Sequence, residues 1–129
     1  MAAMLKASLG SGIGKYDLEK LKSSFLEYYR KSIHVETRLY PGITDILSYT
    51  REKGLAWGIV TNKPMFLTRE LIETFPELAS PAAVVAGDSV ERHKPDPEPV
   101  LKAIELTGSA PGTTLMVGDA LSDVESAVR

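Results

Sequence analysis

The sequence has 129 residues, a length typical of a single domain. It is 43% hydrophobic and 25% charged with a formal net charge of −2, which excludes the composition of a disordered chain and the strongly basic character of many nucleic-acid-binding proteins. It contains no cysteine, which excludes disulfides, thiolate metal sites and cysteine nucleophiles, and no apolar run approaches the ~20 residues of a membrane span. We therefore expect a cytoplasmic protein that binds neither nucleic acid nor a membrane.

The N-terminal part favours a loop followed by one helix. Residues 7–14 contain three closely spaced glycines, which predict a loop, and their spacing is not that of a nucleotide-binding loop. Asp17 is suited to cap a helix that runs to about Ser32. Apolar residues recur along it at helical spacing, a pattern more typical of a packed core than of a cofactor site: Leu18, Leu21, Phe25, Tyr28 and Tyr29.

From Leu39 onward, helical segments alternate with short apolar runs. Pro41 and Gly42 precede a helix that carries Ile43, Ile46 and Leu47, and Gly54 suits the left-handed residue that ends it. Further helices are predicted before Pro76, from Asp96 and Pro97 to near Gly108, and from about Ser122.

Three apolar runs without polar alternation predict strands buried on both faces, at residues 55–60, 82–86 and 114–117. Because these runs alternate with the helices, we predict an α/β fold. Its core would be a Rossmann-like parallel sheet with right-handed crossovers.

Polar side chains follow the predicted strands. Thr61 and Asn62 end the first strand, Lys94 lies in a proline-rich loop after the second, and Asp119 follows the third, with Asp123 four residues later. Each has an ordinary alternative interpretation, as a helix cap, a surface lysine, or a turn and first-turn charge. Together, at one edge of a parallel sheet, they suit an anionic substrate and a hard cation such as Mg²⁺.

Five short motifs occur in order along residues 39–129: Tyr40-Pro-Gly, Val60-Thr-Asn-Lys-Pro64, Gly87-Asp88-Ser89, His93-Lys-Pro-Asp-Pro97 and Val117-Gly-Asp-Ala-Leu-Ser-Asp123. Their combined order and spacing resemble the core domain of the haloacid dehalogenase superfamily. Within it they are most similar to phosphoglycolate phosphatases and related small-molecule phosphatases. Residues 1–38 are similar in position and helicity to the end of the helical cap of that family.

The resemblance implies a Mg²⁺-dependent phosphatase of small phosphorylated metabolites, acting through an aspartyl-phosphate in the complete enzyme. It implies that Thr61 binds the transferring phosphoryl group with support from Asn62, and that Lys63 helps to hold the substrate. Lys94 would steady the phosphate and the nucleophile. The same resemblance makes Asp119 a Mg²⁺ ligand and Asp123 a residue that supports the metal.

The sequence departs from the family at the nucleophile. The family carries Asp-x-Asp at the end of its first core strand, and this sequence contains no Asp-x-Asp. We therefore expect the nucleophile strand to be missing before the N-terminus, and the chain to stop before the last core strand. Two strands, at residues 55–60 and 114–117, would then be unpaired on one side. Unpaired edges recruit other strands, so we expect them to pair with each other or across chains in a homo-oligomer.

Two other functions remain open on the sequence. A chain of this fold without the nucleophile could bind phosphate or a partner without turnover, and phosphate binding without hydrolysis would favour that hypothesis. A receiver-like phosphotransfer domain also uses aspartate and Mg²⁺. Its acidic cluster lies early in the chain, however, where residues 1–38 offer none.

Overall fold

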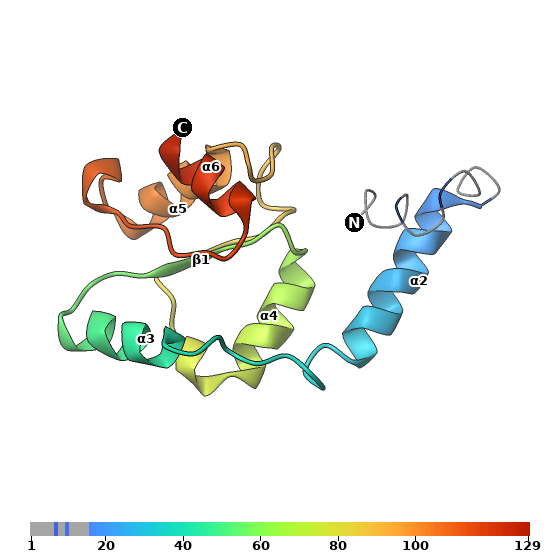
Figure 1. Cartoon of the computed structure of the whole chain (residues 1–129), viewed down its shortest axis with the longest axis horizontal. Helices are drawn as coiled ribbons and strands as arrows, with labels where there is room; N and C mark the ends of the chain where they lie inside the picture. Colours follow the sequence, from blue (N-terminus) through green and yellow to red (C-terminus); the bar gives the residue numbers. More distant parts are fainter. Residues whose placement is uncertain (1–6, 8–9, 11–15) are drawn as a thin grey trace. The chain divides into compact units, whose positions relative to one another are not determined.

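The chain divides into two compact units, residues 1–37 and 38–129, in a computed structural model that describes residues 7, 10 and 16–129 (Figure 1). The described part of the first unit is dominated by helix α2 (Leu18–Lys31). Asp17 caps it as predicted, because its Oδ1 accepts hydrogen bonds from the backbone N of Glu19 at 3.0 Å and of Lys20 at 3.3 Å. The predicted loop at 7–14 lies mostly outside the described residues, and the cap assignment of this unit stays a prediction.

The second unit alternates helices and strands, as the sequence predicts. In chain order its elements are α3 (Ile43–Glu52), β1 (Gly58–Val60), α4 (Met65–Thr74), the 3₁₀ turn η2 (Pro76–Leu78), β2 (Ala83–Val85), α5 (Glu98–Thr107), the 3₁₀ turn η3 (Pro111–Thr113) and α6 (Leu121–Val128). None of the helices within the described ranges combines the length and apolarity needed to cross a bilayer.

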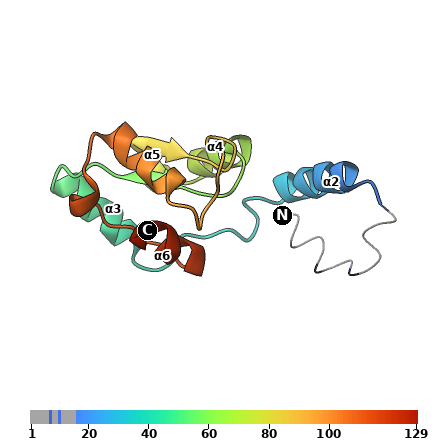
Figure 2. The same cartoon turned by 90° about the horizontal axis from the view of Figure 1, so that it is seen from above.

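Strands β1 and β2 form a parallel pair, with Gly58 opposite Ala83 and Val60 opposite Val85. A Cβ at Gly58 would lie 3.0 Å from the carbonyl oxygen of Ala83, so a larger residue would crowd the pair. Helix α5 packs against both strands, and Figure 2 shows it beside them. The buried core joins Ala83 and Val85 of β2 to Ala103 of α5.

Glycines end two helices where the sequence predicts. Gly54 follows α3 with φ 62°, and Gly108 is the C-cap of α5 with φ 65°. In this left-handed region a side chain is strained, which explains why glycine suits both positions. At the other end of α5, the Oδ1 of Asp96 accepts a hydrogen bond from the backbone N of Glu98 at 2.9 Å. The predicted start of this helix at Asp96 and Pro97 is therefore confirmed to within a residue.

The predicted third strand is wrong. Residues 114–117 lie outside the two-stranded sheet, with Leu115 85% exposed and Val117 54% exposed. The other two predicted strands shorten from 55–60 and 82–86 to β1 and β2. A strand is stabilised by the ladder it shares with a neighbour, and the only ladder in the described part of the chain joins β1 to β2.

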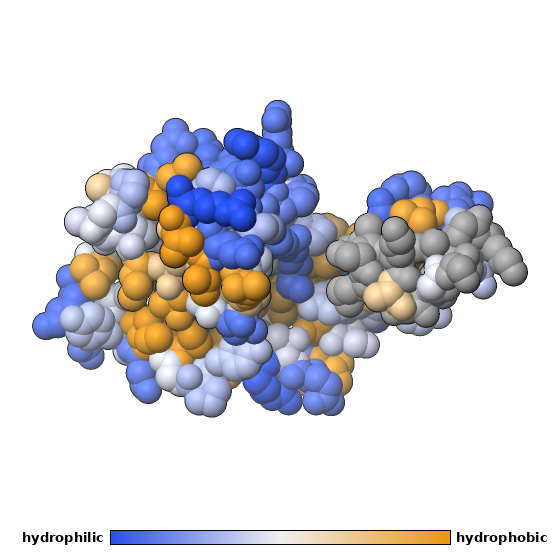
Figure 3. All heavy atoms as spheres, turned by 45° about the horizontal axis from the view of Figure 1, so that its top comes forward, coloured by the Kyte–Doolittle hydropathy of each residue, from blue (hydrophilic) through white to orange (hydrophobic). Residues whose placement is uncertain are grey.

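The expected direct pairing of residues 55–60 with 114–117 is also wrong, whereas pairing across chains stays a prediction. Large apolar side chains remain exposed in residues 114–128, and Figure 3 shows apolar side chains gathered on one face of the second unit. Besides Leu115 and Val117, those more than half exposed here are Leu121, Val124 and Val128. The two strands and four helices of this unit therefore leave these side chains uncovered.

Candidate functional site

The candidate site lies at the carboxyl ends of β1 and β2. Because the strands are parallel, the loop after β1 (residues 61–64) and the loop after β2 (residues 86–97) leave the sheet at the same edge. Helix α6 contributes Asp123 to this edge through its contact with Lys94. This arrangement links Asn62 to Lys94 and Lys94 to Asp123, each pair about 30 residues apart in the sequence.

An ion pair between Lys94 and Asp123 is the centre of the site. Lys94 Nζ lies 2.6 Å from Asp123 Oδ1 and donates a second hydrogen bond to the Val60 carbonyl oxygen at 2.7 Å. The side chains of Lys94 and Asp123 are only 9% and 8% exposed. A buried pair of this kind holds its geometry, since separating the charges would leave each one desolvated and uncompensated.

Asp123 is held in its ionised form by its surroundings. Burial by itself would raise the pKa of its carboxyl group. The hydrogen bond and charge of Lys94 outweigh that effect, together with the backbone N–H groups of Ala120 and Asp119, so that the pKa lies below its ordinary value. Asp123 Oδ2 accepts the Ala120 N–H at 3.0 Å, which also fixes the first turn of α6.

The Asn62 side chain binds the backbone of Lys94 at two points. Its Oδ1 accepts the Lys94 N–H at 3.1 Å, and its Nδ2 donates to the Lys94 carbonyl oxygen at 3.0 Å. The amide predicted to support the phosphoryl group thus fixes the backbone of the neighbouring loop in this structure. The Asn62 backbone also lies close to the loop after β2. A Cβ added at Gly87 would lie 2.5 Å from the Asn62 carbonyl oxygen.

Thr61 and Lys63 lie in a tight turn directly after β1. The Thr61 N–H donates to the Val85 carbonyl oxygen at 2.9 Å, which extends the strand pairing by one bond. Its hydroxyl accepts the Lys63 N–H at 3.1 Å, and the Lys63 carbonyl oxygen accepts the Gly87 N–H at 2.8 Å. The Thr61 hydroxyl therefore keeps its own proton to donate, as binding an anion requires.

Asp119 lies in the connection between residues 114–117 and α6, and it is exposed. Its Oδ2 accepts a hydrogen bond from the Tyr40 hydroxyl at 3.1 Å. This hydrogen bond and the negative charge of Asp119 raise the pKa of Tyr40, so the phenol stays protonated and remains a donor. The Tyr40-Pro-Gly motif therefore contributes a side chain to the site, although the sequence had given it no chemical role.

The two carboxylates fit a divalent cation unequally. Asp119 is an exposed carboxylate of the kind that Mg²⁺ accepts as a ligand. Asp123 already takes Lys94 Nζ on one oxygen and Ala120 N on the other, which suits an indirect role better than direct coordination. No group of three or more acidic or histidine side chains able to hold a metal occurs among the residues described. The predicted metal roles of both residues stay predictions.

Two carboxylates that the sequence did not single out for a role organise the loops. Asp88 Oδ1 accepts the backbone N–H of Met65 at 2.9 Å and so caps α4 from the loop after β2. Glu98 accepts the backbone N–H groups of Glu91 and Arg92, each at 3.1 Å. Asp88 lies within a recognised motif, but its partner is 23 residues away, so sequence spacing offered no signal for this contact.

Comparison with known protein families and curated proteins gives a consistent result. Residues 3–129 match the family described as haloacid dehalogenase-like hydrolase. The chain is 36% identical over 124 residues to N-acetylmuramic acid 6-phosphate phosphatase of Pseudomonas aeruginosa, covering 96% of this chain and 55% of the relative. It is also 36% identical over 107 residues to phosphoglycolate phosphatase of Escherichia coli K12, covering 83% of this chain and 42% of the relative.

Solved structures show the same fold. A Lactobacillus plantarum protein with the provisional designation phosphoglycolate phosphatase matches 99% of this chain and 60% of its own, with a TM-score of 0.82 and 26% identity. A HAD phosphatase from Thermococcus onnurineus matches 88% of this chain and 49% of its own, with a TM-score of 0.66 and 33% identity. The chain spans about half the length of the curated relatives that it matches.

Proposed function

The chain belongs to the haloacid dehalogenase-like hydrolase family, and from that premise we propose that it serves the Mg²⁺-dependent hydrolysis of phosphate monoesters of small metabolites. The observation that carries the proposal is the Lys94 ammonium, held 2.6 Å from Asp123 at the edge where the Thr61 hydroxyl also lies. A fixed cation and a hydroxyl donor at the same edge of the sheet suit the oxygens of a phosphoryl group. The relatives named as phosphatases support the same reaction class.

In this proposal each residue has a separate task. Thr61 donates a hydrogen bond from its hydroxyl to a phosphoryl oxygen, Lys63 helps to hold the substrate, and Lys94 neutralises charge on the phosphate. Asn62 acts through Lys94 by fixing its backbone. Mg²⁺, when held by Asp119 with Asp123 in support, would supply further charge compensation for the phosphoryl oxygens.

The attacking group is proposed to come from outside these 129 residues. The sequence contains no Asp-x-Asp, so these 129 residues lack the motif that carries the attacking aspartate of the family. The relatives are about twice as long as the matched part, which leaves room for such a segment in a longer protein. The competing hypothesis of a chain that binds phosphate without turnover is less well supported, because the similar curated proteins are named as phosphatases.

Two substrates are proposed for testing. Phosphoglycolate comes first, because the sequence motifs and the E. coli relative both point to it. N-acetylmuramic acid 6-phosphate comes second, because the relative of that name aligns over 96% of this chain rather than 83%. Both are small phosphate monoesters, so the same edge of the sheet would receive the phosphate in each case.

Phosphate release from both compounds tests the proposal. The assay compares two proteins, the product of the longest genomic reading frame that contains this chain and the 129-residue chain itself. Each is assayed with Mg²⁺ and with EDTA. We expect Mg²⁺-dependent release by the longer protein. Saturable phosphate binding by a longer protein that releases phosphate from neither compound would instead favour the non-catalytic hypothesis.

We also propose that the chain associates with other copies of itself. In the part of the chain that the structure describes, one edge of β1 and residues 114–117 have no strand partner, and each can accept a strand from another copy. Light scattering of the 129-residue chain should then show a dimer or larger species, which Leu115→Lys disrupts. Leu101→Lys is the matched control. Leu101 is also an exposed leucine (51%), but it lies on α5, which packs on the β1–β2 pair, and not in residues 114–117. A monomeric wild-type chain would contradict this proposal.

A further inference from the structure

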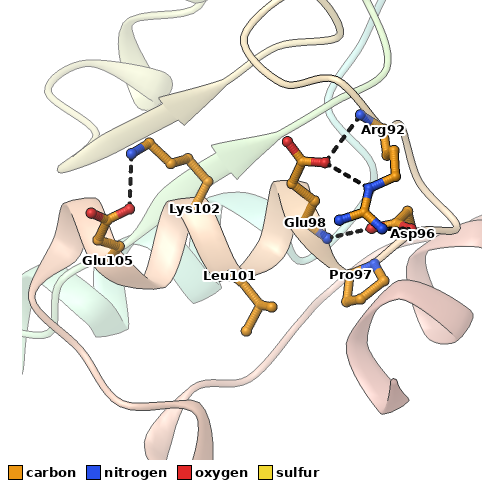
Figure 4. Close-up of a pocket in the computed structure, with 7 residues that line it drawn as sticks. All are labelled: Arg92, Asp96, Pro97, Glu98, Leu101, Lys102 and Glu105. Atoms are coloured by element: carbon orange, nitrogen blue, oxygen red, sulfur yellow. Dashed lines mark hydrogen bonds and ion pairs between the residues drawn. The ribbon is translucent and has the colours of Figure 1, made fainter.

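The loop that carries Lys94 is held by a carboxylate outside the candidate site. Glu98 is the first residue of α5, and Figure 4 shows its side chain turned back toward Arg92. Its Oε1 accepts the Glu91 backbone N–H at 3.1 Å. Its Oε2 accepts the backbone N–H and the side-chain Nε of Arg92, both at 3.1 Å. One carboxylate thus fixes two consecutive peptide groups just before Lys94.

The other end of the loop is fixed by separate contacts. Asp96 caps α5 through the Glu98 N–H, and the Asp96 carbonyl oxygen accepts the Ser126 hydroxyl at 2.6 Å. Arg92 also lies 3.4 Å from Asp96 Oδ2, measured from its Nη1, which links the two ends across the loop. Lys94 therefore lies in the middle of a short segment that is held on both sides.

The Glu98 carboxylate is suited to this task because it stays ionised. The backbone hydrogen bond from Glu91 is the main cause that lowers its pKa, with further contributions from Arg92, against an opposing effect of burial. A charged acceptor makes stronger hydrogen bonds to N–H groups than a neutral one. Loss of the carboxylate would release residues 91 and 92, the residues that precede the lysine of the site.

We propose that Glu98 is a positioning residue for Lys94: by holding the N–H groups of Glu91 and Arg92, it sets the backbone from which the Lys94 ammonium reaches Asp123 and the Val60 carbonyl oxygen. The catalytic part of this inference rests on the proposed function, whereas the structural part rests on the geometry alone. Glu98 lies on the groove of about 280 Å³ along α5 rather than in the site, so its effect is exerted through the loop.

Hydrogen exchange of the Lys94 amide tests the structural part without any activity. In the wild-type chain this N–H is bound to Asn62 Oδ1 and should be protected. In Glu98→Ala we expect exchange at Lys94 to be about 10-fold faster or more, with the amides of β1 and β2 unchanged. Glu105→Ala is the matched control, because Glu105 is on the same helix and forms an exposed ion pair with Lys102. It should leave Lys94 protected.

Kinetics of the protein encoded by the longer reading frame test the catalytic part. Glu98→Ala should lower kcat by about 10- to 100-fold, the usual range for residues that orient a ligand-binding group, with a smaller change in KM. Glu105→Ala should leave both constants unchanged. Glu98→Gln keeps one acceptor oxygen, so its kcat should lie between those of Glu98→Ala and Glu105→Ala. If the alanine variant does not fold, Glu98→Gln replaces it in both measurements.

The outcomes separate the two proposals. Unchanged Lys94 exchange in a folded Glu98 variant would overturn the positioning role, whatever the activity. Faster exchange in a protein whose wild type has no phosphatase activity would support the positioning role and count against the proposed function. Faster exchange together with an unchanged kcat would show that Glu98 positions the loop but that this position does not matter for turnover, which overturns the catalytic part.

Discussion

The cation end and the carboxylate end of the candidate site are built differently. At the cation end, Lys94 and Asp123 are almost buried, and Asn62 binds the Lys94 backbone at two points. At the carboxylate end, Asp119 is exposed, and the Tyr40 side chain that donates to it belongs to a residue that is 66% exposed. The difference indicates that the lysine is positioned by the fold, whereas the Asp119 carboxylate can still adjust to what binds it.

Asp119→Asn should have the largest effect, because it removes a charge that the proposed chemistry uses. In the longer reading frame we expect turnover to fall by about 10²–10³-fold, as is typical when one electrostatic contact to the reacting group is lost. The Mg²⁺ concentration for half-maximal rate should rise, while the free energy of unfolding should change little. The measurement is the rate as a function of Mg²⁺ concentration.

Tyr40→Phe is the control for this first prediction. It removes the hydroxyl that donates to Asp119 but leaves the carboxylate charge, so its effect on the rate should be much smaller. Near-normal activity of Asp119→Asn with an unchanged Mg²⁺ response would show that the carboxylate end takes no part in the reaction.

Asp123→Asn should lower stability strongly, in contrast to Asp119→Asn, which should change it little. Removing one partner of a buried ion pair costs about 3–5 kcal/mol, and asparagine keeps an acceptor oxygen for Lys94 Nζ, so we expect about 3 kcal/mol. Urea unfolding at pH 7 measures this difference. Glu105→Gln breaks the exposed pair with Lys102 and should change stability by less than about 1 kcal/mol. Equal effects of the two substitutions would mean that the cation end is no more rigid than the surface.

Acid should weaken the same pair. The pKa of Asp123 is lower in the folded chain than its ordinary value of about 3.9, so its contribution to stability is complete above that value. The contribution is lost as the pH falls through the lower folded pKa. The difference in unfolding free energy between the wild type and Asp123→Asn should therefore be constant from about pH 7 to 5 and shrink below about pH 4. A difference that does not shrink in acid would show that Asp123 is not stabilised as an anion.

Much of the second unit could be predicted from the sequence, because local signals decide its helices. Asp96 starts α5 and Gly108 ends it, as caps and glycines commonly do. The sequence wrongly predicted a strand at 114–117, since an apolar run becomes a strand only where a neighbour offers hydrogen bonds. The sequence also placed Asn62, Lys94 and Asp123 at one edge, but not the bonds among them, because those depend on contacts about 30 residues apart.

Asp88→Ala should have the smallest effect and marks the boundary of the site. Asp88 lies in the Gly87-Asp88-Ser89 motif, yet its carboxylate accepts the Met65 N–H and so acts as a cap for α4. Loss of a cap costs about 1 kcal/mol, and Asp88→Asn, which keeps an acceptor, should cost less. Turnover should remain within about 2-fold of the wild type, because α4 begins after the Thr61 turn and the cap does not touch Lys94. A 10-fold loss of turnover in an Asp88→Ala variant of undiminished stability would instead place this carboxylate in the chemistry, and the carboxylate end would then extend from Asp119 across to the loop after β2.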